Sequence, residues 1–136
     1  MKWLLTLLLL IPTLLYSQRI EEIDGKYRAR IEYSVTDKSI DYIFNNAKSW
    51  IEIEFQKSKM NNVTIYTNSK KLSGTVYNKK LSFNIEIICN DGSFVTKFSD
   101  FYLNKKPLKE KDIKKVNKYL FELSGRMQKY IRYNDL

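Results

Sequence analysis

The chain has 136 residues, of which 29% are charged and 43% hydrophobic, and this balance is typical of a globular protein. Lysine and arginine outnumber aspartate and glutamate by 24 to 15, so the net charge of +9 favours anionic partners such as lipid head groups, cell-wall polymers or nucleic acid. The absence of histidine and the single cysteine, Cys89, exclude an intramolecular disulfide and a cysteine–histidine nucleophile pair.

Residues 1–17 have the order of a secretory signal peptide. Lys2 precedes an apolar run at residues 3–15, and the small residue Ser17 follows it. The run is shorter than the roughly 20 residues needed to cross a bilayer, so an uncleaved membrane anchor is the alternative reading. We therefore expect an exported protein, periplasmic or at the cell surface, whose mature chain has no stable membrane span.

The chain after this signal begins with a polar stretch, residues 18–25, that we expect to be a flexible leader. Residues 26–136 are expected to form a single domain. Between residues 26 and 35 apolar and polar side chains alternate, which is the pattern of a half-buried strand. The inward face of this strand carries Tyr27, Ala29, Ile31, Tyr33 and Val35.

Residues 37–57 have the spacing of an amphipathic helix, with Thr36 or Asp37 as the expected N-cap. Its apolar residues recur at steps of three and four, so they lie on one stripe that faces the core. They are Ile40, Ile43, Phe44, Ala47, Trp50, Ile51 and Phe55. The large side chains of Phe44 and Trp50 are expected to anchor the core.

Four more strands are predicted, at residues 63–67, 71–77, 81–89 and 94–103. Gly74 indicates a bulge or a close approach of another segment. The strand at 81–89 alternates most clearly, and its pattern places Cys89 inward as a buried, inert thiol. Asp91-Gly92 after it predicts a tight hairpin turn, because both residues tolerate a positive φ.

Pro107 is expected to end the sheet, and residues 109–133 have the spacing of a second amphipathic helix. Gly125 weakens its middle by about 1 kcal/mol relative to alanine. Its apolar stripe is Ile113, Val116, Leu120, Leu123, Met127, Tyr130 and Ile131.

The resulting order, β-α-β-β-β-β-α, predicts an α+β fold in which both helices cover one face of a five-stranded, curved antiparallel sheet. The other face should meet water and carry polar residues of mixed charge. They are Arg28, Arg30, Glu32, Ser73, Thr75, Tyr77, Ser82, Asn84, Glu86 and Lys97.

Three stretches together resemble a known bacterial family. They are the helix motif Ile43-Phe44-x-x-Ala47-x-x-Trp50-x-x-x-x-Phe55, the strand Leu72-Ser73-Gly74 and the hairpin Ile87-Ile88-Cys89-Asn90-Asp91-Gly92. With the signal peptide and the element order, they are similar to a secreted family of unknown function that has a TATA-binding-protein-like (TBP-like) fold. The resemblance covers about residues 33–103, implies that fold, and transfers no catalytic residue.

The sequence predicts no catalytic, cofactor-binding or metal-binding residue, and therefore a non-enzymatic protein. Glu52 and Glu54 are two apart on a helix and face different directions. Glu86 paired with Asp91 or Asp100 is the alternative acid–base couple, although solvated strand-end acids are the simpler interpretation. No phosphate-binding loop or metal-ligand spacing is present in the sequence.

The expected role is a binding or interaction module whose partner is an envelope protein or an anionic surface, and nucleic acid is not expected because the chain is exported. A lysine-rich run enters the last helix and suits anionic lipid head groups, although Glu110, Asp112 and Glu122 interrupt it. The lysines are Lys105, Lys106, Lys109, Lys111, Lys114, Lys115 and Lys118. The alternative is a carrier that holds a small apolar ligand between the sheet and the last helix, beside Trp50, Phe83, Leu120 and Met127.

Overall fold

Antiparallel strands form one seven-stranded sheet in the computed structural model, which describes residues 20–55 and 60–133. The strands are β1 (Ile20–Ile23), β2 (Lys26–Ser34), β3 (Met60–Tyr66), β4 (Lys71–Asn78), β5 (Leu81–Asn90), β6 (Ser93–Leu103) and β7 (Lys106–Pro107). The helices are α2 (Ile40–Glu54), the short 3-10 helix η1 (Glu110–Asp112) and α3 (Ile113–Tyr133). The sheet order is β1-β2-β6-β5-β4-β3, and β7 pairs with β6.

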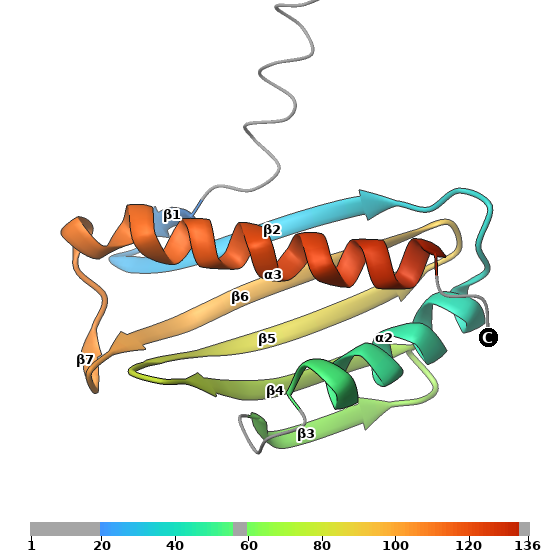
Figure 1. Ribbon diagram of the computed structural model, residues 1–136, viewed down its shortest axis with the longest axis horizontal. Coiled ribbons are helices and arrows are strands. Elements are labelled where there is room, and N and C mark those ends of the chain that lie inside the picture. Colours follow the sequence, from blue (N-terminus) through green and yellow to red (C-terminus); the bar gives the residue numbers. More distant parts are fainter. Residues whose placement is uncertain (1–19, 56–59, 134–136) are drawn as a thin grey trace, which may run out of the picture.

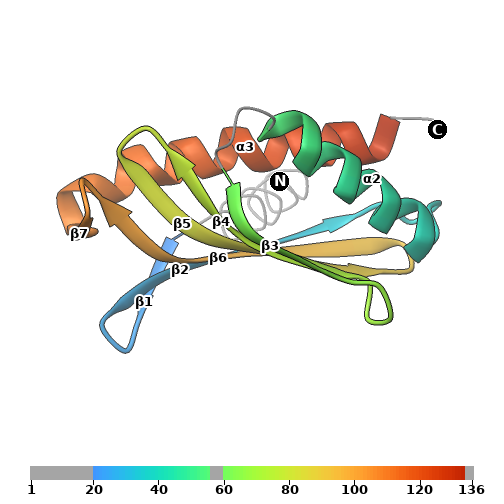
Figure 2. The ribbon, with the colours of Figure 1, turned by 90° about the horizontal axis from the view of Figure 1, so that it is seen from below.

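Both helices lie on the same face of the sheet, as the sequence predicted (Figures 1 and 2). In Figure 2 the tips of the β1–β2 and β3–β4 hairpins bend away from the helices. This curvature makes the uncovered face of the sheet concave, and we call it the open face. The predicted class, a curved antiparallel sheet with two helices on one face, is therefore confirmed.

The prediction of five strands is wrong, because short strands are added beside β2 and β6. β1 lies within the expected leader, where Ile20 pairs with Ala29 of β2 and is buried. β7 contains Pro107, which pairs with Tyr102 and is the last residue of the sheet, as expected. Strands of four and two residues are too short to show an alternating pattern, and proline is tolerated in such an edge strand.

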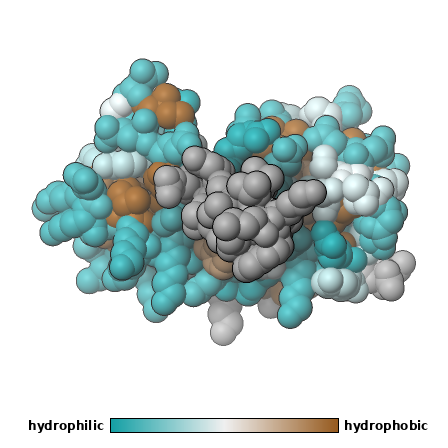
Figure 3. Space-filling model, turned by 90° about the horizontal axis from the view of Figure 1, so that it is seen from above, coloured by the Kyte–Doolittle hydropathy of each residue, from teal (hydrophilic) through white to brown (hydrophobic). Residues whose placement is uncertain are grey.

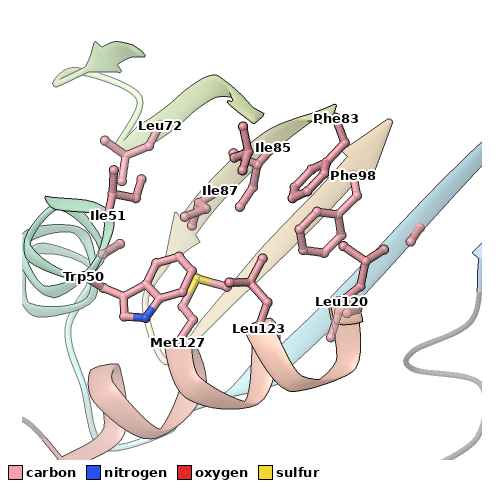
Figure 4. Close-up of a cluster of buried hydrophobic side chains, with 14 of the residues drawn as sticks. Trp50, Ile51, Leu72, Phe83, Ile85, Ile87, Phe98, Leu120, Leu123 and Met127 are labelled. Carbon is pink, nitrogen blue, oxygen red and sulfur yellow. The ribbon is translucent and has the colours of Figure 1, made fainter. Parts of the chain in front are cut away.

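The core lies between the sheet and the helices. All five inward residues of β5 are buried, as their alternation predicted: Leu81, Phe83, Ile85, Ile87 and Cys89. In Figure 4, side chains of α2, α3 and the central strands point toward one another in this layer, with Trp50 and Met127 meeting between the two helices. Phe44 and Trp50 are both buried, in agreement with their expected role as core anchors.

β6 contains a bulge that changes which of its residues face the core. Asn84 pairs with Ser99 and Ser82 pairs with Tyr102, so two residues of β6 stand opposite Phe83. One of them is Asp100, whose φ of 53° lies in the left-handed region. Because of this extra residue, both Phe98 and Phe101 are buried, and their rings lie 5.7 and 5.9 Å from the Phe83 ring.

The N-terminus of α2 is capped by Ser39, which corrects the expected cap at Thr36 or Asp37. The Ser39 hydroxyl accepts a hydrogen bond from the backbone N–H of Tyr42 at 3.2 Å. A second cap comes from the β5–β6 turn, because the Asp91 carboxylate accepts from the backbone N–H of Ile40 at 2.8 Å. The expected helix end at residues 56 and 57 lies outside the described residues.

Gly74 is explained by a close approach, as predicted. A methyl group at Gly74 would run into the Met60 side chain and would lie 3.3 Å from the Asn61 carbonyl oxygen. β3 begins at Met60, before the expected start at residue 63, and its pairing with β4 shifts register between Asn61 and Thr64. This register shift interrupts the two-residue alternation of β3, so the start of the strand was not predicted from the sequence.

Candidate functional site

The open face is hollowed into a groove of about 850 Å³. In Figure 3 this hollow lies between two raised ends of the molecule, and the atoms drawn around it are mainly hydrophilic. Of the residues predicted for the open face, those that line the groove are Arg28, Arg30, Ser73, Thr75, Asn84, Glu86 and Lys97. Glu32, Tyr77 and Ser82 are not among the lining residues. The volume is within the range of about 300–1,000 Å³ that is usual for ligand sites.

The strand register brings two cations face to face in this groove. Arg30 of β2 stands directly opposite Lys97 of β6, and both side chains are exposed. Arg28 lies two residues before Arg30 on the same side of β2. Within the described part of the chain, none of these three cations forms an ion pair. Like charges directly opposite each other repel, and Glu86 of β5 is the acidic neighbour on the other side of Lys97.

Two acidic groups of the groove, Glu86 and Asp100, contact other side chains of the sheet, whereas Glu21 of β1 stands opposite Arg28. Glu86 stands opposite Lys97, yet its carboxylate lies 3.6 Å from the Lys71 Nζ. Asp100 accepts a hydrogen bond from the Asn84 side-chain amide at 2.7 Å. The side-chain carbonyl oxygen of Asn84 in turn accepts a hydrogen bond from the Thr75 hydroxyl at 2.8 Å. This chain of hydrogen bonds crosses β4, β5 and β6 and fixes the polar floor of the groove beside the cations.

Glu86 and Asp100, one of the acid–base couples that the sequence left open, both line the groove, and each has another partner. Glu86 pairs with Lys71, while Asp91 caps α2. Asp100 is held by Asn84. Glu54 binds Arg126 of α3, with the Arg126 Nε 2.9 Å from a carboxylate oxygen, and this hydrogen bond raises the pKa of Arg126. The groove therefore offers charged and hydrogen-bonding groups, and its Glu86 and Asp100 each contact a different side chain.

Cys89 is buried and carries no disulfide in the structure. Burial raises the pKa of its thiol to about 12. Because the thiolate is the nucleophile, a thiol with this pKa is unreactive at neutral pH. Among the described residues, no group of three or more histidine, cysteine, aspartate or glutamate side chains is placed to hold a metal ion.

The position proposed for an apolar ligand is occupied by packed side chains. Trp50, Phe83, Leu120 and Met127 are each at most 3% exposed, and none lines either described cavity (Figure 4). The second cavity, about 190 Å³, lies instead between α2 and the edge strand β3. It is smaller than the usual ligand site.

Asp100 and Glu21 also line the groove, and the sequence pattern predicted neither of them there. Asp100 enters through the β6 bulge, and Glu21 belongs to β1, which was not predicted as a strand. The ten residues of the open face were predicted from alternation alone. Alternation indicates the face on which a residue lies, but it does not determine which residue stands opposite on the neighbouring strand. The opposition of Arg30 and Lys97 is such a neighbour relation.

Comparisons with known proteins match the fold of this chain. A TBP-like protein from Parabacteroides distasonis superposes with a TM-score of 0.65 and 14% identity, over 85% of this chain and 98% of that chain. A DUF4468 family protein from Bacteroides ovatus has a TM-score of 0.57 and 12% identity, over 86% of this chain and 91% of that chain. No family model and no curated protein matches the sequence.

These two likenesses confirm the resemblance to bacterial proteins with a TBP-like fold. At 14% and 12% identity they show the fold alone. In the part of the chain that the structure describes, no helix is both long enough and apolar enough to pass through a bilayer.

Proposed function

We propose that this protein is an exported, non-catalytic binding module of the cell envelope, and that its open face receives an anionic group of its partner. Export rests on the signal-like order of residues 1–17. A binding role is supported by a groove in which Arg28, Arg30 and Lys97 form no ion pair within the described residues, while Glu86 and Asp100 contact Lys71 and Asn84.

The opposition of Arg30 and Lys97 is the observation that carries this proposal. A carboxylate or phosphate between the two side chains would accept charge-assisted hydrogen bonds from both and would remove their mutual repulsion. The guanidinium of Arg30 presents a planar set of donors that matches either anion, and Arg28 adds a second such group on the same strand.

The neighbouring polar groups give the site a defined shape. Asn84 is held on both sides, by Thr75 and by Asp100, so its orientation is fixed before a partner arrives. A binding group that is already ordered loses less side-chain entropy on binding. Asp100 also places a negative charge at the edge of the groove, which disfavours a partner that is uniformly acidic and favours one with a localised anionic group.

The test is a titration followed by NMR of the backbone amides, with tripolyphosphate as the localised anion and a ten-residue glutamate peptide as the uniformly acidic probe, which should bind more weakly. We expect shifts confined to β2, β5 and β6. Arg30→Gln/Lys97→Gln should weaken binding by roughly tenfold or more, because two charge-assisted hydrogen bonds are lost.

The matched control is Lys114→Gln/Lys118→Gln, which removes the same charge from α3 and should leave the affinity within about twofold of the unaltered protein. An equal loss of affinity in both variants would mean that binding depends only on the net charge of the protein. That result, or the absence of shifts in β2, β5 and β6, would overturn the proposal.

A further inference from the structure

The outward side of α3 forms a second charged surface, on the opposite side of the molecule from the groove. Lys114, Lys118, Phe121, Gly125 and Lys129 follow one another at steps of three or four, so they lie on one face of this helix. The three lysines and Phe121 are exposed, and Lys115 is exposed beside them. We call Lys114, Lys115, Lys118, Phe121 and Lys129 the lysine ridge.

The lysines of the ridge are not used to hold the fold together. None of them forms an ion pair with a residue that the structure describes. The two arginines of α3 are used internally, since Arg126 binds Glu54 and Arg132 donates to the Ser34 carbonyl oxygen at 2.7 Å. The only acidic residue of α3 is Glu122. The ridge therefore has an excess of positive charge that faces solvent.

Phe121 is the unusual member of the ridge. The apolar stripe that packs on the sheet consists of Val116, Leu120, Leu123, Met127 and Ile131, each at most 3% exposed. Phe121 lies outside this stripe, among the lysines, and is 54% exposed. A large apolar side chain at this position lies outside the core, and contact with a partner surface would bury its apolar area.

The shape and chemistry of the ridge match a flat anionic surface. α3 has 21 residues and is therefore about 30 Å long, and its outward side is uncovered along this length (Figures 1 and 2). No residue of α3 lines either described cavity. Lysines that surround an aromatic side chain are typical of helices that lie at the bilayer interface, with the charges at the head groups and the ring below them.

We propose that the lysine ridge docks the exported protein on an anionic lipid bilayer, with Phe121 inserted at the interface and the open face turned away from the lipid. The orientation follows from the fold, because both helices lie on one side of the sheet and the open face is the other side (Figure 2). The bilayer then holds the protein while the groove remains accessible. The ridge would thus fix the protein at the membrane, and the groove would bind the partner.

The first test is co-sedimentation of the exported, processed chain with phosphatidylcholine vesicles, with and without 30% phosphatidylglycerol. We expect binding only to the anionic vesicles, and weaker binding at high salt. Each lysine near an anionic surface is worth roughly a fivefold change in partitioning, so Lys114→Gln/Lys118→Gln should lower it by about 25-fold. Arg30→Gln/Lys97→Gln, with the same loss of charge, should leave it within about twofold.

The second test reports where residue 121 lies. In Phe121→Trp, we expect the tryptophan emission to shift to shorter wavelength on anionic vesicles and to be quenched by brominated lipid, while buried Trp50 gives a constant background. Phe121→Ser should bind more weakly than the unaltered protein.

Three results would overturn the proposal: equal binding to neutral and anionic vesicles, equal loss in both charge variants, or no change at residue 121. A fourth result would also overturn the proposal. If the protein bound a glutamate peptide or a single-stranded oligonucleotide more tightly than vesicles, and Lys114→Gln/Lys118→Gln abolished that binding, the ridge would be the site for that partner. The groove titration is independent of all these results, because its probes are soluble and its variant differs.

Discussion

Cys89 shows how its surroundings decide the chemistry of a single side chain. It lies on the buried face of β5, opposite Phe94 of β6, and is 2% exposed. The surrounding apolar side chains disfavour the thiolate, which is why the pKa rises from its usual 9.0 to about 12. The residue therefore contributes to packing, and its nucleophilic chemistry is suppressed.

We expect Cys89 to resist an aromatic disulfide reagent at pH 8 in the folded protein and to react completely in guanidinium chloride. Its thiol ionises near pH 9 when unfolded and near pH 12 when folded, so its contribution to stability is present below pH 9 and is lost as the pH rises toward 12. The free energy of unfolding of Cys89→Ala should therefore fall less between pH 8 and 11 than that of the unaltered protein, as measured by urea unfolding. Rapid labelling of the folded protein would contradict this account.

Arg30 and Lys97 are exposed, in contrast to Cys89, and their possible role in binding depends on the residues beside them. Either residue alone is an ordinary solvated cation on a strand. The register between β2 and β6 places them directly opposite each other. That neighbour relation, at the scale of two residues, is what makes the open face a candidate anion site.

At the scale of elements, α3 illustrates how far a helical pattern can be read. Its apolar stripe was predicted correctly, and Val116, Leu120, Leu123, Met127 and Ile131 are buried. The helix interior contains Gly125, and a methyl group added there meets no atom within 4 Å. The glycine is therefore not required by packing, and its effect is the loss of helix propensity.

Gly125→Ala should raise the free energy of unfolding by about 1 kcal/mol, because alanine restricts the unfolded chain and favours the helix. Gly74→Ala is the contrasting variant. Its added methyl group would displace the flexible end of the Met60 side chain and would lie 3.3 Å from the Asn61 carbonyl oxygen, so we expect less stabilisation than at position 125. Urea unfolding monitored by circular dichroism measures both, and a destabilised Gly125→Ala variant would show that α3 needs a glycine there.

At the scale of the whole molecule, the β5–β6 turn holds the start of α2 in place. The backbone N–H of Val35 donates to the Gly92 carbonyl oxygen at 2.8 Å, and the Gly92 N–H donates to the Lys38 carbonyl oxygen at 2.9 Å. Asp91 caps Ile40 from the same turn. Segments more than fifty positions apart thus fix where the helix begins.

Asp91→Ala should lower the free energy of unfolding by about 1 kcal/mol, because a helix-terminal N–H loses its acceptor and the helix dipole loses a favourable charge. Asp91→Asn keeps an acceptor and should cost less. Asp37→Ala is the control, since the Asp37 side chain is 76% exposed and its partner is the adjacent Lys38. Equal effects of the alanine variants at 91 and 37 in thermal unfolding would remove the special role of the cap.

The sequence by itself determined the local patterns of this protein. Period-two alternation placed the inward faces of β2 and β5, and the 3.6-residue period placed the apolar stripes of α2 and α3, because burial of one face imposes these spacings. The element order then predicted one antiparallel sheet with both helices on one side. It also gave the residues of the open face, although it did not show which of them meet.

Only the tertiary structure decided what depends on contacts between distant segments. The pairing of β1 and β7, the bulge at Asp100 and the cap from Asp91 each depend on a partner strand or turn that no local spacing reveals. The same holds for the opposition of Arg30 and Lys97. Cross-strand register is fixed by the packing of the whole sheet, and a spacing of two is equally compatible with every shift of two residues along the neighbouring strand.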